Sequence, residues 1–153
     1  MSLAVVYSRA AVGIDAPLVS VETHLANGLP ALSIVGLPET EVKESKDRVR
    51  AALLNTRFDF PSRRITINLA PADLPKEGGR YDLPIALGIL SATRQLPDAQ
   101  LCSHEFFGEL ALGGERWPTI WVDARGRGPG NSRGMDRGAS RGPTRRSRWK
   151  NPQ

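Results

Sequence analysis

The amino-acid sequence predicts an α+β sandwich in residues 1–115, with helices mainly on one side of a sheet, followed by a disordered tail in residues 116–153. Three observations lead to this fold class. Short apolar runs with a period of two indicate strands, apolar positions at helical spacing indicate helices, and the composition changes abruptly after Glu115. The order β, ββ, α, β, α, β mixes hairpin strands with single crossover helices, as α+β domains do.

The first three strands are expected in the N-terminal third of the chain. Residues 3–7 are apolar and β-branched, and residues 18–25 alternate, which places Val19, Val21, Thr23 and Leu25 on one face and His24 on the other. Asn27-Gly28 follows directly. Both residues tolerate the positive φ of a type I′ turn, so we expect residues 31–35 to return beside residues 18–25 as a hairpin.

The next segment predicts an amphipathic helix that ends near Asn55. Thr40 is a candidate N-cap, and Lys43, Lys46 and Arg50 lie on the polar side. The apolar stripe that would face the core consists of Val42, Val49, Ala52 and Leu53.

A strand at residues 63–69 is followed by a Gly-rich loop and a second helix, and residues 106–112 (FFGELAL) predict a last strand. Gly78 and Gly79 let the loop backbone adopt a positive φ or approach a partner closely. Asp82 is expected to cap the second helix rather than to act as a catalytic carboxylate, because no second carboxylate, histidine or metal ligand is fixed beside it by the sequence.

Basic residues around this loop form the candidate contact site. Lys76 and Arg80 flank the glycine pair, and with Arg63 and Arg64 they could form a rim for a phosphate backbone or an acidic partner. The alternative is local pairing with the carboxylates of the loop, Asp73, Glu77 and Asp82.

Charge is distributed unevenly along the chain. Residues 1–115 contain eleven Lys or Arg and fourteen Asp or Glu, whereas residues 116–153 contain ten and two, so the net charge of +5 arises from the tail. The single Cys102 excludes an internal disulfide, and two histidines, His24 and His104, offer no metal-ligand spacing. Because no signal peptide or membrane-length apolar run is present, we expect a cytoplasmic protein without a membrane partner.

The tail contains few apolar residues, and they follow no period, so it is expected to be disordered. An Arg/Gly-rich tail with tryptophans could bind RNA or single-stranded DNA through phosphate contacts and stacking. The alternative is that the tail is the product of a shifted reading frame in a truncated gene.

Three stretches carry a family resemblance: GLPETEVKESKDRVRAAL, RRITINLAPADLPKEGGRYDLPIALGIL and FFGELAL. They closely resemble the N-terminal domain of the YifB/ComM family, the Mg-chelatase-like AAA ATPases of bacteria. The resemblance implies a Lon-protease-like fold of the ribosomal-protein-S5 domain-2 type, here incomplete. Its motif loop corresponds to Pro75, Lys76, Glu77, Gly78, Gly79 and Asp82.

Members of that family are implicated in DNA processing, as hexameric branch-migration helicases in natural transformation, so the resemblance implies DNA and further copies as partners. No Walker A motif is present in these 153 residues, so ATP and Mg²⁺ are expected only with the AAA+ module and this chain is not expected to be an enzyme on its own. The alternative is a Lon-like serine peptidase. No serine follows Gly79 until Ser91, so no catalytic residue is assigned.

Overall fold

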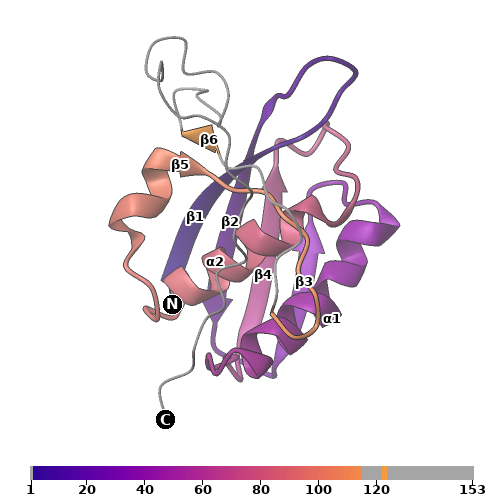
Figure 1. Cartoon of the computed structure of the whole chain (residues 1–153). Helices are drawn as coiled ribbons and strands as arrows, with labels where there is room; N and C mark the ends of the chain where they lie inside the picture. Colours follow the sequence, from indigo (N-terminus) through magenta and orange to yellow (C-terminus); the bar gives the residue numbers. More distant parts are fainter. Residues whose placement is uncertain (1, 115–121, 124–153) are drawn as a thin grey trace, which may run out of the picture.

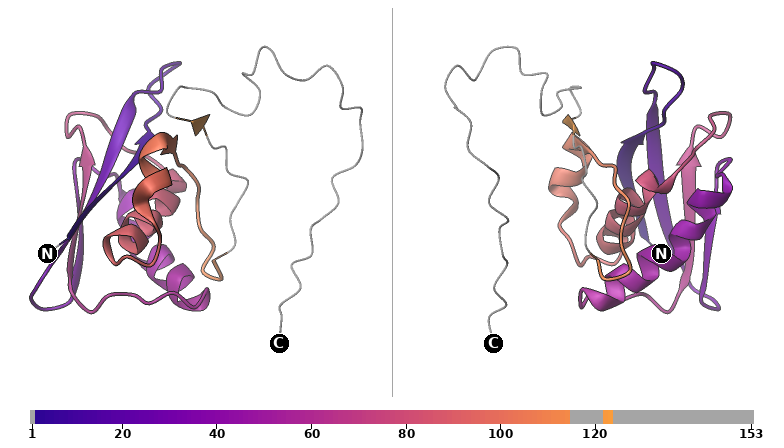
Figure 2. Two further views of the ribbon diagram at one scale, coloured as in Figure 1. Left: turned by 90° about the vertical axis from the view of Figure 1, so that its left-hand side faces the viewer. Right: turned by 45° about the vertical axis from the view of Figure 1, so that its right-hand side comes forward.

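A mixed sheet with helices on one face forms the domain, as Figures 1 and 2 show for the computed structural model. The structure describes residues 2–114 and 122–123, so the predicted tail lies outside the described residues except at Val122 and Asp123. The strands are β1 (Ser2–Arg9), β2 (Leu18–Ala26), β3 (Ala31–Val35), β4 (Arg64–Ala70), β5 (His104–Glu105) and β6 (Val122–Asp123). They lie in the order β3-β4-β2-β1-β5-β6, which confirms the α+β class.

The predicted hairpin between β2 and β3 is wrong. β4 lies between these strands, antiparallel to β2 and parallel to β3, with Ala31 beside Arg64 and Val35 beside Asn68. A type I′ turn needs a positive φ at both central residues. Gly28 has a φ of 135°, but the φ of Asn27 is not positive. Residues 27–30 therefore connect β2 to a strand that is not its neighbour, and the longer β4 pairs with β2 instead.

Two helices, α1 (Thr40–Asn55) and α2 (Asp82–Ala92), cover one face of the sheet. The predicted apolar stripe of α1 is buried, together with Ser45. The N-cap of α1 is Glu39 and makes no side-chain hydrogen bond, so Thr40 is the first helical residue rather than the cap. Helix α2 contacts β1, β2 and α1 and is buried on most of its surface. No helix in the described ranges is long and apolar enough to cross a membrane.

The predicted strand at residues 106–112 does not form. A short helix, η2 (Asp98–Ser103), leads into β5, which pairs with β1 only at Tyr7. The chain then crosses the N-terminal end of α2: Gly108 N donates to Arg80 O at 2.8 Å, and Leu83 N donates to Gly108 O at 2.9 Å. These backbone groups are used to complete the first turn of α2, so they are not available for a sheet ladder.

Glycine permits the close contact between α2 and the sheet. A Cβ atom built on Gly88 would lie 2.3 Å from Thr23 Oγ1, on the face of β2 that the alternation pattern assigned to the core. Thr23 Oγ1 is itself buried without a hydrogen-bond partner in the described structure. The helix therefore rests directly on β2 at this point.

We expect Gly88→Ala to destabilise the domain by about 1–2 kcal/mol, because an overpacked core costs more than the helix propensity that alanine adds. Thr23→Ala removes the clashing oxygen, so the double variant should recover most of the loss. Urea unfolding of the four proteins measures the coupling energy. Additive effects of the two substitutions would contradict the contact.

Candidate functional site

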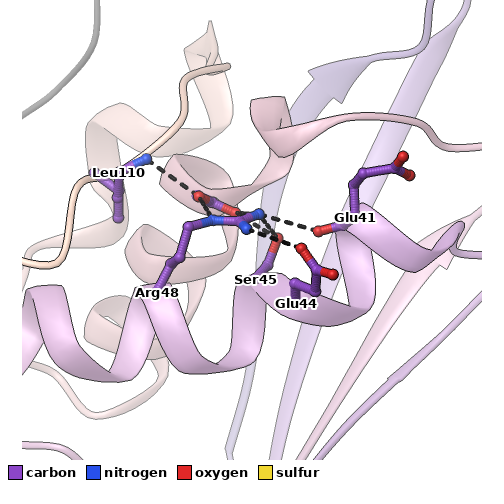
Figure 3. A network of polar contacts seen from close by, with 6 residues as sticks. Glu41, Glu44, Ser45, Arg48 and Leu110 are labelled. Carbon is purple, nitrogen blue, oxygen red and sulfur yellow. Dashed lines mark hydrogen bonds and ion pairs between the residues drawn. The ribbon is translucent and has the colours of Figure 1, made fainter.

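The carboxylate of Asp82 forms the centre of a polar network at the first turn of α2, and its partners Ser45, Arg48 and Leu110 are labelled in Figure 3. Asp82 is fully buried and accepts hydrogen bonds from Ser45 Oγ, from Arg48 Nε at 2.7 Å and from Leu110 N at 3.1 Å. The prediction that Asp82 caps α2 is wrong, since the N-cap is Tyr81 and no side-chain cap bond forms. Asp82 instead connects α2 to α1 and to the segment that follows β5.

Arg48 is positioned for this role by the geometry of α1. Its side chain also donates to Glu41 O at 3.0 Å and lies 3.6 Å from Glu44 Oε2, one turn before it on the same helix. Hydrogen bonding to Asp82 raises the pKa of the Arg48 guanidinium above its ordinary value. This increase in pKa is larger than the decrease that burial causes. The buried carboxylate thus has a permanent cationic partner, as a buried charge requires.

Lys76, predicted as a contact residue, is buried inside the loop. Its Nζ donates to Gly36 O at 2.8 Å and to Pro71 O, while Glu39 N donates to Lys76 O at 3.1 Å. Burial lowers the pKa of Lys76, and the nearby charge of Asp73 opposes this shift. The side chain therefore joins the end of β4 to the connection between β3 and α1.

Gly36 must be glycine for this arrangement. Its φ is 98°, and a Cβ atom there would lie 2.1 Å from Leu69 O. The close approach places the Gly36 carbonyl within reach of Lys76 Nζ. Sequence reasoning considered a special backbone at Asn27-Gly28 and at Gly78 and Gly79 but not at Gly36; Gly78 has a φ of 73°.

The motif loop is thus held in place by its own ionisable groups. The Ser45 hydroxyl donates to Asp82, and the Lys76 ammonium donates to two backbone carbonyls. Arg80 is exposed, Ser91 is a buried residue of α2, and Pro75 and Glu77 are exposed. This arrangement fixes the geometry of the loop and leaves Arg80 as its accessible cation.

A second basic cluster lies at the opposite end of β4. Arg63 and Arg94 line a cleft of about 350 Å³ together with Ser2, Leu25, Ala92 and Thr93, and Arg64 begins the adjoining strand. Arg63 donates to Asn27 Oδ1 at 2.7 Å, and Arg64 is exposed. Within the described ranges, ion pairs involve Arg9 and Arg48, whereas none involves these three arginines.

The four predicted contact residues therefore do not form one rim. Arg63 directly precedes β4 and Arg64 is its first residue, whereas Lys76 and Arg80 follow the strand. The seven residues of β4 separate the two groups by roughly 20 Å. Sequence reasoning missed Arg94, which has a φ of 60° just beyond α2. Its side chain joins the cleft because the helix ends beside the start of β1, where Ser2 Oγ donates to Ala92 O at 2.7 Å.

A metal site is not evident in residues 2–114 and 122–123, where no group of three His, Cys, Asp or Glu side chains could hold an ion. Cys102 is exposed, and His24 is half-buried, as the alternation of β2 predicts.

Tyr81 closes the base of the loop from within the core. It is fully buried, and its hydroxyl donates a long hydrogen bond of 3.4 Å to Arg9 O. Arg9 in turn forms an ion pair with Glu105 at 2.7 Å. Burial raises the pKa of Tyr81 to about 12.

Comparison with known proteins places this fold and its motif loop in one family. Residues 21–121 match the family described as subunit ChlI of Mg-chelatase, and the chain belongs to that family. It is 63% identical to the competence protein ComM of Haemophilus influenzae over 75% of this chain, and 60% identical to the protein YifB of Salmonella typhimurium over 74%. The chain spans less than a quarter of the length of either relative, 23% and 22%.

We expect Asp82→Ala to destabilise the domain by about 3 kcal/mol, because it leaves Arg48 without its carboxylate and Leu110 N without an acceptor. Glu44→Ala is the matched control, since Glu44 is an exposed partner of the same arginine and its loss should cost less than about 0.5 kcal/mol. Urea unfolding measures both. Equal losses would show that the buried bonds contribute little.

The raised pKa of Tyr81 predicts a loss of stability in alkali. The unfolded chain releases the phenol proton near pH 10, its ordinary value, whereas the folded protein retains it to about pH 12. The stabilisation is complete below pH 10 and is lost as the pH rises through 12. In thermal melts, the stability of the wild type should therefore fall relative to that of Tyr81→Phe over this range. A constant difference between them would contradict the shift.

Proposed function

We propose that this chain is the non-catalytic, Lon-like domain of a ComM-type DNA-processing ATPase, and that it engages DNA through the cleft lined by Arg63 and Arg94, beside which Arg64 begins β4. Two things support the family role: the match over residues 21–121, and the high identity to a relative named for competence. An S5 domain-2-like fold is compatible with the α+β sheet and its one-sided helices.

The observation that carries DNA engagement is the positive charge of the cleft, whose arginines form no ion pair with residues 2–114 or 122–123. Among the described residues, the other half-buried arginines, Arg9 and Arg48, are neutralised by carboxylates. In contrast, Arg63 has an amide as its partner, and Arg94 lines the same concave surface. Guanidinium groups that line one surface, with no carboxylate partner in the described part of the chain, suit a phosphate backbone, which they bind in a bidentate manner.

The peptidase alternative is less favoured by the geometry of the loop. A lysine that activates a serine must offer a free amine to the hydroxyl. Lys76 Nζ donates to Gly36 O and Pro71 O, and Ser45 donates to a carboxylate, so both groups serve the fold. We propose that ATP and Mg²⁺ act only in a motor module and that the domain works in the cytoplasm, where its DNA would be found.

Fluorescence anisotropy with labelled single-stranded, duplex and four-way-junction DNA tests this role. For the double variant Arg63→Ala/Arg94→Ala we expect at least a tenfold loss of affinity, and a fall of about 2 in the slope of log K against log salt, one per phosphate contact. The control is Lys43→Ala/Lys46→Ala, which removes the same charge from the polar side of α1.

Two results would contradict the proposal that DNA binds at the cleft. Equal losses in the two double variants would show a non-specific charge effect. Loss of binding only on deletion of residues 116–153 would assign the DNA contact to the Arg/Gly-rich segment, the alternative that the composition of the tail offers.

A further inference from the structure

The outer edge of β3 is an open edge of the sheet. β3 is the terminal strand on this side and pairs with β4 (Figure 1). Ala31 N donates to Arg63 O, so the main-chain groups of Ala31, Ser33 and Val35 face β4. Because these directions alternate along a strand, the N–H and C=O groups of Leu32 and Ile34 face outward. No backbone partner within the described structure is found for them.

This edge lacks the usual protection. Natural sheets blunt their edges with charged side chains, proline within the strand or bulges. Residues 25–38 contain no Asp, Glu, Lys or Arg, and β3 contains no proline. Large apolar side chains are exposed beside it: Leu29 is 81% exposed, Leu37 55% and Val35 44%.

The ends of the edge are closed, which limits what can pair with it. Pro30 has no amide hydrogen, and the Gly36 carbonyl is already bound by Lys76 Nζ. The open groups are therefore those of Leu32 and Ile34, placed symmetrically on either side of Ser33. A strand that satisfies them must present the same groups at the same spacing.

We propose that β3 pairs with β3 of a second copy of this chain, antiparallel, about a two-fold axis at Ser33. In this register Leu32 of each copy faces Ile34 of the other, and each such pair exchanges two hydrogen bonds. The same register brings Leu29 of one copy to Leu37 of the other at both ends of the contact. No like charges meet at the axis, because the segment is uncharged.

A disulfide tests the register directly. Ser33 would face its own copy in a non-hydrogen-bonded antiparallel pair, where Cα atoms lie about 4.5 Å apart, within the range that a disulfide spans. In a Cys102→Ser background, Ser33→Cys should form a covalent dimer on mild oxidation, seen on a non-reducing gel and by intact mass. Ser20→Cys, on the same sheet face but two strands away from the edge, should remain monomeric.

Sedimentation velocity of the full chain provides the second measurement. We expect a concentration-dependent dimer for the wild type and for Ser33→Thr, and a monomer for Ser33→Lys, which places two ammonium groups at the axis. Far-UV circular dichroism should be unchanged, since Ser33 is exposed. A wild type that remains monomeric up to its solubility limit, a Ser33→Lys variant that still dimerises, or equal cross-linking at positions 20 and 33 would each overturn the proposal.

Discussion

The buried pair of Asp82 and Arg48 is the interaction on which the layout of the domain depends. It connects α1, the start of α2 and the main chain at Leu110, which are far apart in sequence. A fully buried carboxylate is tolerated only when its partners satisfy it, so the three segments must arrive together. The Lys76 cluster then fixes the other side of the same loop against the connection from β3 to α1.

The patterns in the sequence predicted most of the strands and helices correctly, but they did not predict which strands lie side by side. Apolar runs and alternation located β1, β2, β3 and β4, and helical spacing located α1 and α2, because burial imposes these patterns locally, although the strand expected at residues 106–112 did not form. It could not show that β4 separates β2 from β3. The choice between two possible neighbours is decided by packing across the whole sheet, to which a local turn signal such as Asn27-Gly28 contributes little.

The candidate site was only partly predictable for the same reason. The sequence identified the loop and four basic residues near it in the chain, yet the partner of Asp82 lies 34 positions away and Arg94 enters the cleft only through the end of α2. In the folded domain Lys76 binds backbone carbonyls and stabilises the loop, whereas Arg63 and Arg94 lie on one surface. The motif that identifies the family is therefore mainly structural, and apart from Arg80 the accessible basic residues of the candidate site lie elsewhere.

Because Lys76 is buried, the reactivity of its amine would report on the opening of the loop. Lys43 lies on the exposed side of α1, and Lys46 is partly exposed, whereas the Lys76 amine is enclosed and bound by two carbonyls. An amine-reactive label would modify the helix lysines at once and Lys76 only when the loop separates from Gly36. The rate at which the label appears on Lys76 itself would thus measure how often this corner of the molecule opens in solution.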